Sequence, residues 1–294
     1  MESLLARTQK LLRRSGLRAR KGLGQHFLID ENVLEQILSA AQLAPEDMVV
    51  EVGPGLGVLT RELAKHAGRV VAIELDNNLA ALLKESLSPF KNVTIINEDV
   101  LKIDPSALLR ELKAENPDKY GTPYVNRRYK VVANLPYYIT SPVLRHFLEA
   151  PIKPQSMVVM VQKEVAEEIT AKPGRMSLLS IGVQLYGLPT IVAQVPARSF
   201  YPAPAVDSAI LKVMPYSRPP VEIADDESFF RLVRAGFCAA RKQLANSLAQ
   251  GLGISKEEGL GLLARAQIDS QRRAESLSIQ EWAHLWKIYS EAEK

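Results

Sequence analysis

The sequence predicts an α/β fold with a doubly wound, largely parallel sheet, followed by a smaller all-helical domain. In the first half of the chain, short apolar runs alternate with amphipathic segments, as expected of parallel strands joined by crossover helices. We expect strands at 48–52, 70–74, 93–97, 130–133 and 156–162. We expect helices, with apolar residues at three- and four-residue spacing, at 31–42, 58–66, 77–87 and 141–149.

The pattern changes toward the C-terminus. Segments 190–195 and 208–214 are expected to extend the sheet as an antiparallel pair of strands. After a proline-rich turn, residues 226–291 show helical periodicity alone. Because glycine interrupts helices, we expect breaks at Gly251, Gly253, Gly259 and Gly261.

These patterns predict the domain organisation. We expect a basic N-terminal arm at 1–22, an α/β domain at 23–214 and a helical domain at 215–294. Residues 114–129, which contain prolines, a glycine and an asparagine, are expected to form a long loop inside the α/β domain.

The composition is that of an intracellular globular protein. The chain has 294 residues, 47% of them hydrophobic, and its longest apolar runs are too short to span a bilayer. The single cysteine, Cys238, excludes an internal disulfide and a Cys-X-X-Cys redox motif, and we expect it to be a small buried residue on a helix. We therefore expect a cytoplasmic protein without a metal site.

Basic residues gather at two places, although the net charge is only +4. Residues 1–22 carry seven basic side chains against the single acid Glu2, and a second basic group lies between 231 and 273. Such zones suit the neutralisation of nucleic-acid phosphates, but they also fit solvated helix faces. The arm, with its leucines and arginines, is also compatible with a mitochondrial transit peptide.

A glycine-rich turn follows the first predicted strand. Gly53, Gly55 and Gly57 stand between the strand at 48–52 and a helix, where glycine allows a ligand to approach the backbone closely. Such a turn serves nicotinamide, flavin or S-adenosylmethionine, or only a tight connection. The Gly-X-Gly-X-Gly spacing favours S-adenosylmethionine over a dinucleotide.

Acidic residues end the next two predicted strands. Glu74 ends the second, where a carboxylate accepts hydrogen bonds from both ribose hydroxyls, and Asp99 follows the third, where the cofactor's adenine amine would lie. A dehydrogenase needs the first acid but not the second. Either acid alone would fit a helix cap or a solvated strand end, but together they favour a cofactor site.

Asn134, Leu135, Pro136 and Tyr137 follow one another at the end of the fourth predicted strand. Adenine's exocyclic nitrogen is a poor nucleophile because its lone pair is delocalised into the ring. The amide oxygen of Asn134 and a carbonyl of the Leu135–Pro136 turn could accept its two N–H bonds and favour a pyramidal nitrogen. Tyr137 would stack on the extruded base. A plain strand-ending turn is the alternative.

From about Lys21 to its C-terminal helices, the sequence resembles the ribosomal RNA adenine dimethyltransferase family, in the branch that acts on the small subunit. Besides the motifs above, Gly24-Gln25-His26-Phe27-Leu28 is similar to the family's opening motif, and residues 199–208 are similar to its aromatic-proline segment. The resemblance implies a Rossmann-like class I fold that uses S-adenosylmethionine. It assigns Gln25, His26 and Leu28, with Gly53, Gly55, Glu74, Asp99 and Asn134, to the cofactor, and Phe200 to stacking on the base opposite Tyr137.

The resemblance further implies dimethylation of two adjacent adenosines near the 3′ end of small-subunit (16S) rRNA, with a role in subunit assembly. The enzyme would be monomeric, and Arg241 and Lys242 would contact RNA. The sequence departs from the family where His26 replaces the common asparagine and where residues 239–242 are less basic. Two alternatives are a large-subunit rRNA dimethyltransferase and a non-catalytic assembly or nucleic-acid-binding factor on the same fold.

Overall fold

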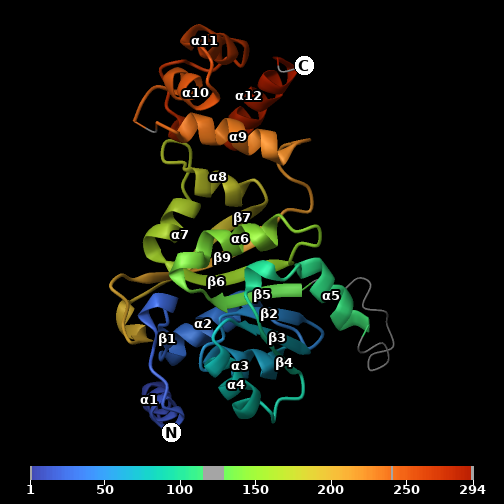
Figure 1. Cartoon of the computed structure of the whole chain (residues 1–294), viewed down its shortest axis with the longest axis vertical. Coiled ribbons are helices and arrows are strands. Elements are labelled where there is room, and N and C mark those ends of the chain that lie inside the picture. Colours follow the sequence, from blue (N-terminus) through green and yellow to red (C-terminus); the bar gives the residue numbers. More distant parts are fainter. Residues whose placement is uncertain (1, 115–128, 240, 293–294) are drawn as a thin grey trace. The chain divides into compact units, whose positions relative to one another are not determined.

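The computed structural model describes residues 2–114, 129–239 and 241–292 (Figure 1). It divides into two compact units: Met1–Ala166 with Pro189–Pro215, and Glu167–Leu188 with Tyr216–Lys294. The end of the first unit at Pro215 lies beside the boundary expected from the prolines. Glu167–Leu188, which we expected in the α/β domain, groups instead with the helical part. Most of the expected loop at 114–129 lies outside the described residues.

A seven-stranded sheet forms the centre of the first unit, in the order β4-β3-β2-β5-β6-β9-β7. Strands β4, β3, β2, β5 and β6 are parallel neighbours, and β9 runs antiparallel to β6. The strands are β2 (Met48–Val52), β3 (Arg69–Glu74), β4 (Val93–Asn97), β5 (Tyr129–Asn134), β6 (Ser156–Gln162), β7 (Gly187–Val195) and β9 (Ser208–Pro215). The winding reverses between β2 and β5, which is where open α/β sheets bind ligands.

The predicted strands and crossover helices of this unit are confirmed, with most ends within one residue. The predicted helices are α2 (Glu31–Ala41), α3 (Val58–His66), α4 (Asn77–Ser86) and α6 (Thr140–Leu148). Two helices were not predicted: α5 (Pro105–Ala114), and α7 (Lys163–Ile169), whose last residues belong to the second unit. The carboxylates of Asp30 and Asp76 cap α2 and α4 by accepting backbone N–H bonds of the first turn. The predicted helices at 31–42 and 77–87 therefore begin at the same residues as α2 and α4.

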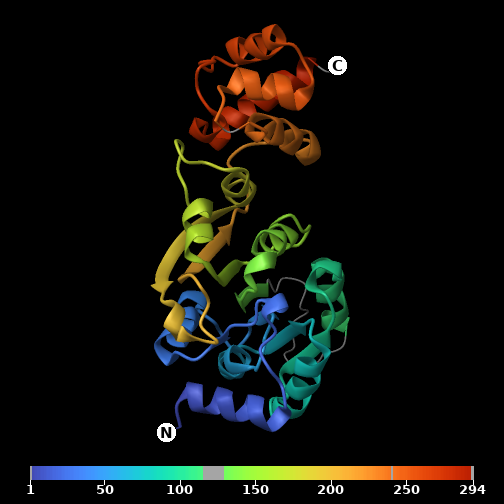
Figure 2. The ribbon, with the colours of Figure 1, turned by 60° about the vertical axis from the view of Figure 1, so that its left-hand side comes forward.

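Helix α1 (Leu4–Ser15) lies within the predicted basic arm (Figure 2). Leu4, Thr8 and Leu12, spaced four residues apart, are buried, while Arg13 and Arg14 are exposed. Leu4 joins the main apolar core, and Leu12 packs in a cluster with Phe27, Leu56 and Leu79. Four of the arm's basic residues, Arg7, Lys10, Arg13 and Arg14, thus lie on a helix that packs against the α/β unit.

A separate two-stranded sheet joins segments far apart in the sequence. Strand β1 (Phe27–Leu28) pairs antiparallel with β8 (Phe200–Tyr201), with Leu28 opposite Phe200. Leu28 and Phe200 both lie in the main apolar core. Short 3₁₀ turns complete the connections: η1 (Lys21–Leu23), η2 (Val100–Lys102), η4 (Tyr137–Ile139), η5 (Ala197–Ser199) and, in the second unit, η6 (Ala274–Ser276).

The second unit contains α8 (Leu178–Gln184), α9 (Asp226–Phe237), α10 (Leu244–Leu252), α11 (Lys256–Arg265) and α12 (Ile279–Ala292). Of the four glycines expected to break helices, only Gly253 ends one, in the left-handed conformation. The predicted breaks at Gly251, Gly259 and Gly261 were wrong, because these glycines lie inside α10 and α11. A Cβ on Gly251 would lie 2.4 Å from Ala235 Cα, and one on Gly259 would lie 3.0 Å from the Ala245 carbonyl oxygen. These two glycines therefore permit close helix packing.

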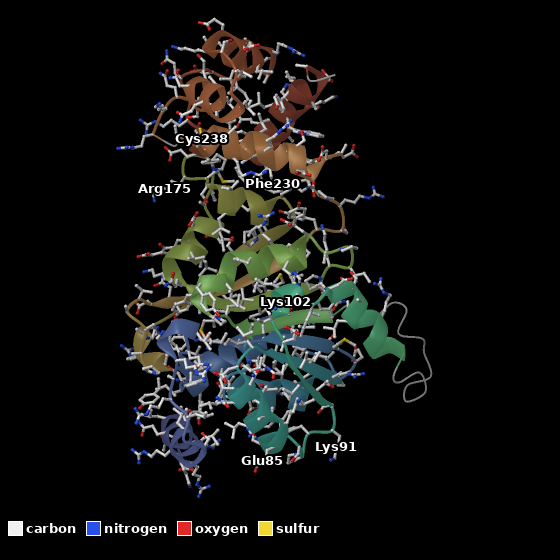
Figure 3. The ribbon with its side chains drawn as sticks, in the orientation of Figure 1. Glu85, Lys91, Lys102, Arg175, Phe230 and Cys238 are labelled. Carbon is white, nitrogen blue, oxygen red and sulfur yellow. The ribbon has the colours of Figure 1, made fainter. Side chains whose placement is uncertain are left out.

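The environment of Cys238 also differs from the prediction. Cys238 is exposed at the C-terminal cap of α9, and its thiol donates to the Ser247 carbonyl at 3.2 Å (Figure 3). The apolar positions of α9 are filled by phenylalanine, leucine and valine, so the cysteine falls outside the buried face. Within the described ranges, no helix combines the length and apolar character needed to cross a membrane.

Candidate cofactor and catalytic site

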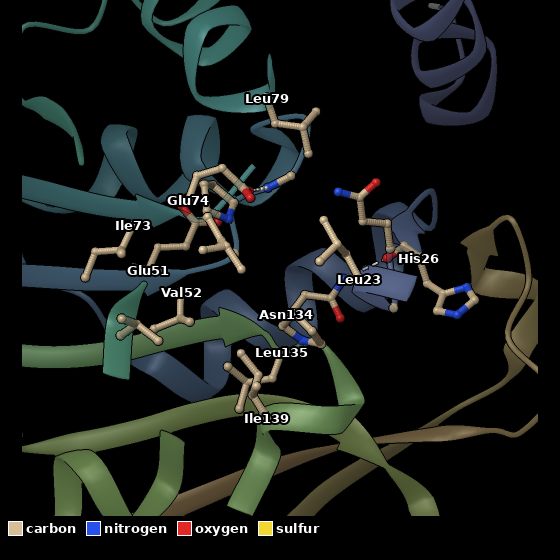
Figure 4. A pocket seen from close by; sticks show the side chains of 18 of the residues that line it. Leu23, His26, Glu51, Val52, Ile73, Glu74, Leu79, Asn134, Leu135 and Ile139 are labelled. Carbon is tan, nitrogen blue, oxygen red and sulfur yellow. Dashed lines mark hydrogen bonds between the residues drawn. The ribbon is translucent and has the colours of Figure 1, made fainter. Parts of the chain in front are cut away.

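A cavity opens in the first unit at the carboxyl ends of β2, β3 and β5. Its walls come from the segment around Gln25, the glycine turn after β2, the ends of β3 and β4 and the turn after β5. Figure 4 shows Glu51 and Glu74 from neighbouring strands, and Asn134 from a third strand, around this cavity. The sheet thus brings together the glycine, acidic and Asn134 motifs predicted from the sequence.

The glycine turn has a backbone that other residues rarely adopt. Gly53 and Gly55 have φ of +67° and +58°. A Cβ on Gly55 would lie 3.2 Å from the Phe27 ring, and one on Gly53 would lie 3.4 Å from Pro136. Side chains here would both strain the backbone and fill the space beside the cavity.

Glu74 is held in place by backbone hydrogen bonds. Its Oε2 accepts from the Gly55 N–H at 3.2 Å and its Oε1 from the Asp76 N–H at 2.9 Å. Burial raises the pKa of Glu74, and these two bonds oppose the rise. Each carboxylate oxygen can accept a further hydrogen bond, so the two oxygens remain able to receive a pair of hydroxyls.

Glu51 is a cavity residue that the sequence reasoning did not assign. It is 1% exposed, and its Oε2 is buried with no hydrogen-bond partner among the described residues. Burial raises the pKa of Glu51 from 4.5 to about 8; the nearby Thr60 hydroxyl opposes the rise, and Glu74 adds a smaller increase. An acid within an otherwise apolar strand was the available signal, because buried carboxylates are rare unless they have a partner or a ligand.

Asp99 lies at the cavity wall after β4, where its Oδ1 accepts from the Leu101 N–H at 3.0 Å. It therefore caps η2, which was the alternative interpretation from the sequence, and also lines the cavity. Leu75 and Leu101, 49% and 37% exposed, line the same part of the cavity. A carboxylate and two leucines at one cavity suit a flat apolar ring that carries an amine.

The orientation of the Asn134 amide is set by a backbone carbonyl. Its Nδ2 donates to the His26 oxygen at 3.0 Å, so its Oδ1 remains available to an N–H group in the cavity. The Pro136 carbonyl accepts from the Ile139 N–H at 3.1 Å, which leaves the Leu135 carbonyl as the second candidate acceptor in this turn. This refines the sequence prediction, which named only the turn.

Tyr137 is held by one contact at its hydroxyl and one at the face of its ring. Its hydroxyl forms a 2.6 Å hydrogen bond with Ser208, and its ring stacks on His26 with a centroid distance of 5.8 Å. Burial raises the pKa of Tyr137, so its hydroxyl stays neutral at physiological pH. A neutral, anchored aromatic ring at the cavity is suited to hold a planar base.

Sequence similarity to known proteins shows the family of this chain. A family model described as "Ribosomal RNA adenine dimethylase" matches residues 16–291. The chain belongs to this family. It is 51% identical to the ribosomal RNA small subunit methyltransferase A of Dehalococcoides mccartyi (strain ATCC BAA-2266 / KCTC 15142 / 195), over 98% of this chain and 94% of the relative. It is 44% identical to the protein of the same name from Moorella thermoacetica, over 95% of both chains.

Solved structures agree with the class I methyltransferase fold. The 23S rRNA methyltransferase ErmE is 28% identical with a TM-score of 0.66, over 90% of this chain and 99% of that one. A dimethyladenosine transferase from Plasmodium falciparum is 24% identical with a TM-score of 0.73, over 91% of this chain and 98% of that one, and supports the fold alone. The predicted Rossmann-like architecture with a helical C-terminal part is confirmed.

In this adenine dimethylase family member, the residues of the opening motif serve different local purposes. His26 supplies the carbonyl that orients Asn134, and its Nδ1 donates to the Pro202 carbonyl at 2.7 Å. Gln25 lines the cavity, and its side-chain oxygen accepts from the Arg20 N–H. Leu28 is buried and also lines the cavity. Their contacts with the cofactor stay predictions.

Other predicted site residues lie away from this cavity's walls. Phe200 is 2% exposed in the apolar core and is absent from the cavity lining, so its stacking on a base remains an expectation from the family resemblance. Arg241 and Lys242 are exposed in the second unit just before α10, where Lys242 contacts Gln250 Oε1 at 3.3 Å. Their exposure is compatible with phosphate contacts.

Proposed function

We propose that this protein uses S-adenosylmethionine to dimethylate the exocyclic amines of two adjacent adenosines near the 3′ end of small-subunit (16S) rRNA. The observation that carries the proposal is the Asn134 amide, whose nitrogen is occupied by the His26 carbonyl and whose oxygen is left for a donor in the cavity. Family membership makes the adenine amine the natural donor.

The cavity residues fit the cofactor. Glu51 offers a buried carboxyl oxygen without a partner, which suits a hydrogen-bond-donating ligand, and Glu74 offers two fixed acceptors for ribose hydroxyls. Gly53 and Gly55 leave open the space that side chains would fill. When bound, S-adenosylmethionine supplies an electrophilic methyl group on its sulfonium.

The protein's own residues prepare the amine. Asn134 Oδ1 and the Leu135 carbonyl accept its two N–H bonds, which localises the nitrogen lone pair and aims it toward the cofactor. Tyr137 stacks on the base. Asn134 cannot act as a base, so the surplus proton leaves to water after transfer. The monomethylated amine keeps one N–H bond, so it can bind in the same pocket and receive a second methyl group.

Small-subunit RNA is the favoured substrate, because the relatives at 51% and 44% identity are named for the small subunit, whereas the 23S rRNA methyltransferase is 28% identical. The exposed cations Arg241 and Lys242 would contact phosphates. We further propose a monomeric, cytoplasmic enzyme that acts on assembling small subunits. An oriented acceptor at Asn134 favours catalysis over a purely binding role.

The test uses the purified protein and radiolabelled S-adenosylmethionine with separate small and large subunits from ribosomes that lack the modification. We expect label in small-subunit RNA, recovered as N6,N6-dimethyladenosine at two adjacent positions. Label in the large subunit instead would favour the alternative rRNA substrate. Tight small-subunit binding without any label would favour the non-catalytic alternative.

A further inference from the structure

Residues 20–26, which we call the covering segment, form a compact turn along one wall of the cavity. The N–H groups of Leu23 and Gln25 donate to the Arg20 carbonyl at 3.1 and 3.4 Å, and the Arg20 N–H donates back to Gln25 Oε1 at 2.8 Å. Leu23, Gly24, Gln25 and His26 face the cavity. Because these bonds close on one another, they hold the segment together as one compact unit.

One end of the covering segment is joined to the cofactor-binding edge by an ion pair. Arg20 Nη1 lies 3.3 Å from Asp76 Oδ2, and the Asp76 side chain is only 4% exposed. The other oxygen of Asp76 caps α4, and its N–H donates to Glu74. A chain of contacts therefore runs from the covering segment through Asp76 to Glu74 and the Gly55 turn.

The other end is anchored independently of this ion pair. The His26 ring donates to the Pro202 carbonyl, and the backbone carbonyl of His26 accepts from Asn134 Nδ2. Phe27 pairs with Tyr201 in the β1–β8 sheet. The covering segment is thus fixed beside Asn134. On its N-terminal side Leu17 and Ala19 pack against the apolar cluster that includes Leu79 of α4, and the ion pair adds a polar contact with the β3–α4 edge. Breaking that pair would loosen the segment between these two anchors.

We propose that the Arg20–Asp76 ion pair keeps the covering segment closed over bound cofactor, so that Arg20 is a positioning residue that sets how long the cofactor stays bound. The proposal rests on the proposed function. S-adenosylmethionine lying between the covering segment and Glu74 leaves when the segment lifts, and the ion pair opposes that motion. The effect falls on cofactor release and not on the chemical step, because the Asn134 contact is held at the far end.

The experiment measures dissociation of labelled S-adenosylmethionine from the full-length protein after dilution into unlabelled cofactor. For Arg20→Ala we expect release about fivefold faster, since a half-exposed ion pair contributes about 1 kcal/mol. Release from the parent should also accelerate with ionic strength, whereas release from Arg20→Ala should not. Arg20→Lys, which keeps the charge, should restore most of the parental residence time.

Two further variants separate the ion pair from general effects. Arg18→Ala removes the same charge from a neighbouring exposed position and should release cofactor at the parental rate. Asp76→Asn removes the charge but keeps a capping oxygen for α4, and adding Arg20→Ala to it should change nothing further. At saturating cofactor and RNA, the turnover number of Arg20→Ala should stay within about twofold of the parent, while KM for the cofactor rises.

Equal release rates for the parent, Arg20→Ala and Arg18→Ala would overturn the proposal, as would additive effects of Arg20→Ala and Asp76→Asn. Hydrogen exchange of the free protein gives a readout that does not depend on cofactor. Amides of the covering segment should exchange faster in Arg20→Ala than in Arg18→Ala, and equal exchange would also count against the ion pair. A parent that binds no S-adenosylmethionine would refute the proposed function, while this exchange comparison would still test the ion pair.

Discussion

The buried carboxyl of Glu51 makes stability depend on pH in a definite direction. Its pKa is about 8 in the folded protein against 4.5 when unperturbed, so above pH 4.5 the folded state holds a proton that the unfolded state releases. The free energy of unfolding of the cofactor-free protein therefore falls as pH rises from about 4.5 to about 8. Linkage gives a loss of about 2 kcal/mol between pH 6 and pH 8 from this group alone.

Glu51→Gln should remove this loss, because a neutral amide of nearly the same shape does not titrate. Urea unfolding of the cofactor-free protein at pH 6, 7 and 8 measures the effect. Glu74, whose pKa is also raised by burial, leaves a residual slope of the same sign. Glu35→Gln, on the exposed face of α2, should keep the parental pH dependence. Parallel stability-against-pH curves for the parent and Glu51→Gln would refute the reasoning.

Three other predictions concern binding and packing. Glu74→Ala and Asp99→Ala should each weaken S-adenosylmethionine binding by about 1 to 3 kcal/mol in calorimetry, because a charged acceptor is lost. Neutralising Arg241 and Lys242 should weaken RNA binding and reduce the slope of log affinity against log salt. Gly251→Ala should destabilise the helical unit by about 1 to 3 kcal/mol in a thermal melt, because its Cβ would lie 2.4 Å from Ala235 Cα.

The packing and RNA-binding predictions each have a matched control. Gly261→Ala meets no atom within 4 Å and lies in α11, so it should raise stability by about 1 kcal/mol; destabilisation by both glycine variants would contradict the packing argument. Neutralising Lys84 and Lys91 removes the same charge from exposed positions of the first unit and should leave the salt slope of RNA binding unchanged. Unchanged cofactor affinity in both acid variants would contradict the placement of the site.

The sheet and its crossover helices could be predicted because their signals are local. Alternating apolar runs, the Asp30 and Asp76 caps and the glycine turn each specify structure within a few residues. Strand order then brings Glu74, Asp99 and Asn134 to one cavity, since the carboxyl ends of parallel strands meet at one edge of the sheet.

The features that the sequence did not reveal depend on contacts between distant segments. Gly251 reads as a helix break until Ala235 of the neighbouring helix is seen to need the space. The amide of Asn134 is oriented by His26, more than a hundred residues earlier, and Ser208 holds Tyr137 from the other direction. Glu51 looks like part of a strand until its missing partner becomes visible.

The central claim is that Asn134 orients the target amine and contributes little to affinity. Single-turnover methylation of small subunits by Asn134→Ala, at saturating S-adenosylmethionine and RNA, tests it most directly, with the exposed Asn77→Ala as the control. By analogy with a lost oxyanion-hole donor, the lost acceptor should cost roughly 2.7 to 4 kcal/mol, a rate about a hundredfold to a thousandfold lower. Binding of cofactor and subunits should stay near parental. Methyl transfer by Asn134→Ala at the parental rate would contradict the account.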